Sequence, residues 1–131
     1  MNKEDYVSFE VAKLLKEKGF NEPCFSQYTK TGSIWNCQAP ENFNESEGCY
    51  SRPSLYEAQK WLRNQHNLYV NAIPLEIPRS KSENFTFTID KLDSNDEWDW
   101  RWEPEPYNFY ATYEEAFSEG ILEALRQVSN E

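Results

Sequence analysis

The chain has 131 residues and a formal net charge of −10 at pH 7, and this charge is confined to one part of the sequence. Residues 1–82 contain ten acidic and ten basic residues, whereas residues 83–131 contain thirteen acidic residues against Lys91, Arg101 and Arg126. An acidic surface of this kind repels nucleic acid and anionic lipid, so we expect neither of them as a direct partner.

The length predicts one domain over residues 1–131 with a single buried core. Phe, Tyr and Trp together number 21, against 18 for Ile, Leu and Val, so aromatic rings must supply much of that core. No apolar signal-like segment opens the sequence, and no run of eighteen apolar residues occurs in it. We therefore expect a cytoplasmic protein.

The first predicted element is a helix over residues 8–18, capped by Ser8 and ended by Gly19. Its apolar residues repeat at helical spacing: Val11, Leu14 and Leu15. Residues 24–37 then have the pattern of a β-hairpin, with Gly32 in the turn.

The next segment, residues 38–53, is rich in Asn, Glu and Ser and predicts a long polar surface loop. A second helix starts at Ser54, where Ser54 and Glu57 form a capping box. A strand over residues 68–77 follows, and Pro74 favours an edge position or a bulge for it.

Two further strands form the most distinctive pattern in the chain. Apolar and polar residues alternate over residues 84–92, turn residues follow at 93–96, and tryptophans then alternate with charged residues over 98–103. The pattern predicts a hairpin with one aromatic face and one charged face.

The last helix, which starts at Thr112, has the strongest apolar periodicity. Gly120 lies on its apolar face, where we expect a bulky residue of the sheet, such as a tryptophan, to pack against the bare backbone. The element order is then helix, hairpin, helix, three strands, helix. It predicts an α+β domain in which three helices cover one face of an antiparallel sheet of about five strands.

The sequence contains no catalytic or metal-binding signature. Cys24, Cys37 and Cys49 are too widely spaced for a zinc knuckle, and the single histidine, His66, lies at a predicted helix end where a cationic ring would suit the dipole. A calcium loop starting at Asp93 lacks both the required glycine and the final glutamate. We therefore expect a protein without enzymatic activity, metal or cofactor.

Trp98, Trp100 and Trp102 permit two interpretations. They can be core residues that a strand lays onto the last helix, or an exposed strip that binds a sugar, a peptide or a partner protein. Sheet packing explains their alternation, so the sequence favours the core interpretation.

The three helical segments resemble a set of small uncharacterised proteins encoded by gut Bacteroides-type bacteria, their prophages and their mobile elements. The similar segments are residues 8–20, 54–63, 112–116 and 120–125. These segments contain caps and core positions, so the resemblance concerns the fold. It implies a phage or mobile-DNA setting and no particular activity.

Together these observations predict an accessory protein that acts by binding another protein with a basic surface, and they leave its oligomeric state open. The predicted binding residues lie in and after the tryptophan-rich strand: Asp96, Trp98, Asp99, Trp100, Trp102, Glu103 and Glu105. One alternative is an acidic mimic of nucleic acid that inhibits a nuclease or another DNA-binding protein. A second alternative is an aromatic strip that binds carbohydrate or peptide.

Overall fold

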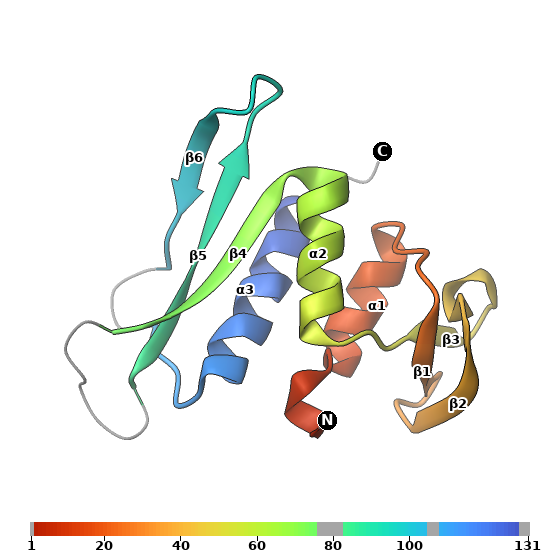
Figure 1. Ribbon diagram of the computed structural model, residues 1–131. Helices are drawn as coiled ribbons and strands as arrows, with labels where there is room; N and C mark the ends of the chain where they lie inside the picture. The colour runs from red at the N-terminus through yellow and green to blue at the C-terminus, as the bar shows by residue number, and fades with distance from the viewer. Residues whose placement is uncertain (1, 76–82, 105–107, 129–131) are drawn as a thin grey trace.

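In the computed structural model of the protein, three helices stand between two separate antiparallel sheets (Figure 1). The structure describes residues 2–75, 83–104 and 108–128. The elements in chain order are η1 (Lys3–Asp5), α1 (Phe9–Glu17), β1 (Cys24–Thr29), β2 (Ile34–Glu41), η2 (Phe43–Glu45), β3 (Cys49–Ser51), α2 (Leu55–His66), β4 (Leu68–Pro74), β5 (Phe85–Leu92), β6 (Trp98–Trp102) and α3 (Tyr113–Gln127).

The α+β class and the three helices are confirmed, but the prediction of one sheet of about five strands is wrong. Six strands form two three-stranded sheets, ordered β2-β1-β3 and β4-β5-β6. The second sheet follows α2 in the chain and packs mainly against α3 and α2, whereas the first sheet lies against α1. Each sheet therefore uses a different part of the helical layer to cover its inner face.

The segment predicted as a polar loop, residues 38–53, is largely ordered secondary structure. It contains the end of β2, the short helix η2 and the strand β3, which pairs with β1. The side chain of Asn44 explains much of this order, since its Nδ2 donates to the Phe20 carbonyl at 2.9 Å and its Oδ1 accepts from the Ser51 N–H at 2.9 Å. The polar residues here satisfy backbone groups in the protein as well as facing water.

The predicted helix starts are confirmed. Ser8 Oγ accepts from the Val11 N–H, and Ser54 and Glu57 form the complete capping box of α2. At the start of α3, Thr112 Oγ1 accepts from the Glu115 N–H at 3.1 Å. There the returning carboxylate of Glu115 accepts from the Ala111 N–H at 3.0 Å.

Gly120 faces the second sheet, as the periodicity of α3 predicts. A Cβ built on it would lie 2.7 Å from Val70 Cγ1 and 3.0 Å from Phe87 Cδ2, so the bulky neighbours are these two residues and not a tryptophan.

β4 lies at the edge of its sheet, which accommodates Pro74 at its end. The buried apolar residues of both sheets and all three helices form one continuous cluster. No helix in the part of the chain that the structure describes is long and apolar enough to cross a membrane.

Candidate functional site

The β5–β6 hairpin positions most of the predicted binding residues, and its turn is fixed by Asp93. The Asp93 carboxylate accepts from the N–H groups of Asn95 and Glu97, at 2.8 and 3.0 Å, and the Asp93 N–H donates to the Glu97 carbonyl. Asp96 takes the left-handed conformation, with φ of 59°, which an aspartate tolerates better than most residues. The turn therefore holds an exposed carboxylate at the tip of the hairpin.

A β-bulge divides the three tryptophans between the two faces of the sheet. Trp102 pairs with Ile89 and Trp100 with Lys91, but Leu92 pairs with Trp98, so Asp99 is an extra residue in β6. One extra residue reverses the alternation of all positions beyond it. Trp98 therefore lies on the outer face, away from the helices.

Ring contacts agree with this division. On the inner face Trp102 stacks on Phe87, with ring centroids 5.3 Å apart and an interplanar angle of 12°. On the outer face Trp98 meets the ring of Tyr69 edge-on at 5.2 Å. The prediction that all three tryptophans form one core face is thus wrong: Trp102 packs against the core, whereas Trp98 is 63% exposed and Trp100 39% exposed.

Hydrogen bonds join polar side chains on the outer face of the second sheet. The Arg101 guanidinium donates from Nε to Asp90 Oδ1 at 2.7 Å, and Asn71 Nδ2 donates to the other oxygen of Asp90 at 3.0 Å. The hydrogen bond that Arg101 donates to Asp90 and the negative charge of Asp90 raise the pKa of Arg101. Asp90, Arg101 and both exposed tryptophans, together with Asp99, line a hollow of about 450 Å³.

The predicted acidic residues have accessible side chains where the structure describes them. Asp96, Asp99 and Glu103 are all exposed, and Glu105 lies outside the described residues. The hairpin thus combines two exposed indoles with at least three exposed carboxylates, whereas Trp102 contributes mainly to packing.

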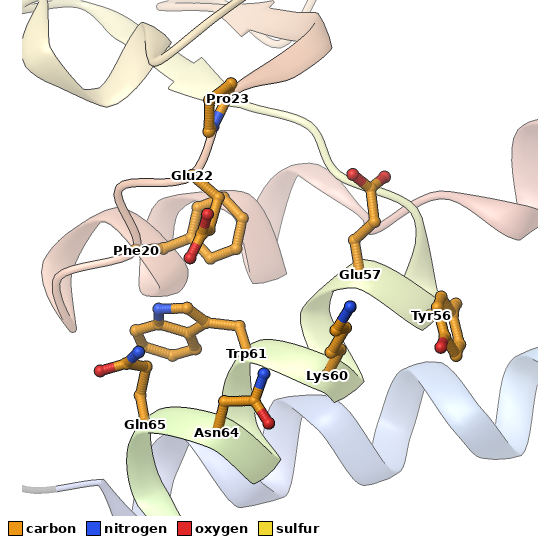
Figure 2. A pocket seen from close by; sticks show the side chains of 9 residues that line it. All are labelled: Phe20, Glu22, Pro23, Tyr56, Glu57, Lys60, Trp61, Asn64 and Gln65. Carbon is orange, nitrogen blue, oxygen red and sulfur yellow. The ribbon is translucent and has the colours of Figure 1, made fainter.

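A second hollow, of about 260 Å³, lies between α2 and the segment that joins α1 to β1 (Figure 2). In it Phe20 and Trp61 meet edge-on with ring centroids 5.5 Å apart, and Glu22, Glu57 and Lys60 lie around them. The Glu57 carboxylate accepts from the Ser54 N–H, so it is committed to the helix cap.

Cys24 and His66 directly follow Pro23 and Gln65, two residues that line this hollow. Burial and the negative charge of Glu57 raise the pKa of Cys24 to about 12, so its thiol stays protonated at neutral pH. Burial and nearby Lys91 lower the pKa of His66, and its ring packs edge-on to Trp61. The expected cationic ring at the end of α2 is therefore a mainly neutral one at pH 7. A neutral ring gains little from the dipole at the end of α2.

All three cysteines are free thiols. Within the described residues no three His, Cys, Asp or Glu side chains are grouped closely enough to hold a metal ion. In the second hollow Phe20 and Trp61 pack together and Glu57 caps α2, whereas the hairpin carries two exposed indoles and several exposed carboxylates.

No family model, curated protein or solved structure matches this chain. The resemblance to proteins of Bacteroides-type bacteria therefore stays a prediction. Inferences about function depend on the chemistry of the hairpin itself.

Proposed function

We propose that the protein binds a partner protein with a basic surface through the β5–β6 hairpin, and that it does so without catalysis. The observation that carries the proposal is the 63% exposure of Trp98 beside exposed Asp96 and Asp99. Tryptophan is enriched at binding hot spots because one ring supplies a large apolar contact. Leaving such a ring in water has no benefit for folding.

The chemistry of the hairpin favours a cationic partner over a neutral one. Carboxylates on both sides of an indole attract lysine and arginine, and the ring face binds the same cations by cation–π attraction. The Trp98 ring is supported by the edge-on contact with Tyr69, so less side-chain freedom is lost on binding.

The experiment is a selection of binders from a displayed library of random peptides, with the purified protein as bait. We expect the selected peptides to be enriched in Lys and Arg next to an apolar residue. Trp98→Ala together with Trp100→Ala should weaken the affinity for the best peptide at least about tenfold, as for a hot-spot residue. Calorimetry measures this affinity.

The matched control is Phe25→Ala with Trp35→Ala, which removes two exposed aromatic residues of the first sheet and should leave the affinity unchanged. Selected peptides without basic residues would contradict the proposal. They would favour the alternative in which an aromatic strip binds carbohydrate or peptide. Binding that survives loss of the indoles but not of the carboxylates would favour a mimic of nucleic acid.

A further inference from the structure

Among the described residues Arg52 is the one charged residue that is buried, with 5% of its surface exposed. It follows β3 directly and precedes the cap of α2. Its N–H donates to the Ser26 carbonyl at 2.9 Å, and the next carbonyl, of Pro53, accepts from the Val7 N–H at 3.1 Å. The backbone on both sides of the side chain is thus fixed.

Two tyrosines and a serine hold the guanidinium group in place. Its Cζ lies 4.1 Å from the ring centroid of Tyr6 and 5.6 Å from that of Tyr28. Nη1 donates to Ser26 Oγ at 3.1 Å. Stacking on aromatic rings is favourable for a guanidinium and orients its plane, but it supplies no negative charge.

The charge of Arg52 has no counterpart among the described residues. None of their carboxylates forms an ion pair with it, and its Nε is buried without a hydrogen-bond partner. A buried charge is costly unless it is paired, so proteins seldom keep one without a use. The protein carries a net charge of −10, yet none of the described carboxylates pairs with this cation.

Arg52 also lines a hollow of about 360 Å³ on the surface. The other lining residues are Lys3, Tyr6, Ile34 and Asn36. In the described part of the chain this lining contains two cations and no carboxylate. Another hollow that shares Lys3 and Tyr6 differs in charge, since Glu4, Glu114 and Glu115 also line it.

We propose that the hollow at Arg52 binds an organic oxyanion, in the form of a carboxylate or a phosphate monoester. The guanidinium offers N–H donors in one plane, the geometry that suits both groups. Lys3 adds a second positive charge and Asn36 an amide donor. Tyr6 and Ile34 line the same hollow, so the carrier of the anion can pack against their side chains.

The test is an NMR titration of the full chain at constant ionic strength with three probes: inorganic phosphate, phenyl phosphate and benzoate. We expect saturable shifts of the backbone amides around the hollow: Tyr6, Ser26, Ile34, Asn36 and Arg52. Phenyl phosphate should bind at least about threefold more tightly than inorganic phosphate, because its ring buries apolar surface. The comparison with benzoate shows which oxyanion the hollow prefers.

Two substitutions complete the test. Arg52→Lys keeps the charge but loses the planar donors, so it should weaken the binding of phenyl phosphate at least about tenfold. Lys3→Gln should weaken it about threefold, whereas Lys13→Gln, the same loss of charge on α1 outside the hollow, should have no effect.

The absence of saturable shifts with all three probes would overturn the proposal. Shifts centred elsewhere, or equal weakening by Lys3→Gln and Lys13→Gln, would overturn it as well. If Arg52→Lys does not fold, the map of shifts and the pair of lysine variants still decide the question, since both lysines are exposed.

Discussion

At the scale of single residues, Gly120 shows how a missing side chain fixes the distance between two elements. It lies in the middle of α3, and the side chains of Val70 and Phe87 pack directly against its backbone. Valine is branched at Cβ and has few alternative rotamers, so it cannot easily move aside. The close contact of α3 with β4 and β5 therefore depends on glycine at this position.

The prediction is that Gly120→Ala destabilises the protein, although alanine favours a helix by about 1 kcal/mol over glycine. The new methyl group would lie 2.7 Å from Val70 Cγ1, and overpacking of this kind costs about 1–3 kcal/mol. Urea unfolding followed by circular dichroism measures the change. Glu119→Ala, an exposed neighbour in the same helix, is the control, and a more stable Gly120→Ala variant would contradict the packing described here.

Arg52 illustrates which residues a sequence pattern does not reveal. Its surroundings come from three distant parts of the chain: Tyr6 beside η1, Ser26 and Tyr28 in β1, and the residue itself after β3. In the sequence it is one arginine in a polar segment, and polar segments usually predict exposure. Its burial is a consequence of tertiary structure alone.

At the scale of elements, the bulge at Asp99 determines what the hairpin presents to solvent. Without the extra residue, Trp98 would lie on the same face as Trp100 and Trp102 and would cover more of the helical layer. With it, Trp98 contacts Tyr69 across the outer face. The bulge thus converts a core-like pattern into an exposed ring.

A double-mutant cycle tests this placement. Tyr69→Ala and Trp98→Ala should be coupled by about 0.5 kcal/mol, the lower end for aromatic pairs because Trp98 is largely exposed. Tyr69→Ala and Trp100→Ala should not be coupled, since these rings lie on opposite faces. Unfolding free energies of the four proteins give each value, and coupling of Tyr69 to Trp100 alone would place the bulge elsewhere.

The elements differ in how well the sequence predicts them, and the reason is physical. Ser8, Ser54 and Thr112 bond to N–H groups within three residues, so local pattern was enough to place the three helix starts. The bulge at Asp99 and the pairing of β3 with β1 depend on partners in other strands. For the same reason the division into two sheets, and the split of the tryptophans, could not be predicted locally.

At the scale of the whole molecule, the helices join two sheets into one core. α3 packs on β4 and β5 and also contacts α1, and Lys18 Nζ donates to the Val128 carbonyl at 2.7 Å. Charge is distributed less evenly than packing, since the net charge of −10 belongs to residues 83–131. The exposed carboxylates of the hairpin therefore act within a molecule in which residues 1–82 are neutral in total.

The last prediction separates the hairpin from the total charge as the cause of binding. The triple variant Asp96→Asn, Asp99→Asn, Glu103→Gln should slow association with a selected basic peptide, because exposed charges steer an encounter over about 10 Å at 0.1 M salt. Stopped-flow fluorescence measures the rate.

The control Glu22→Gln, Glu41→Gln, Glu47→Gln removes the same number of exposed charges from the first half and should change the rate little. Equal slowing by both variants would mean that net charge alone attracts the peptide. This result would contradict the prediction that the hairpin carboxylates guide binding. Unequal slowing that disappears in high salt would identify the hairpin carboxylates as the groups that guide the partner onto Trp98.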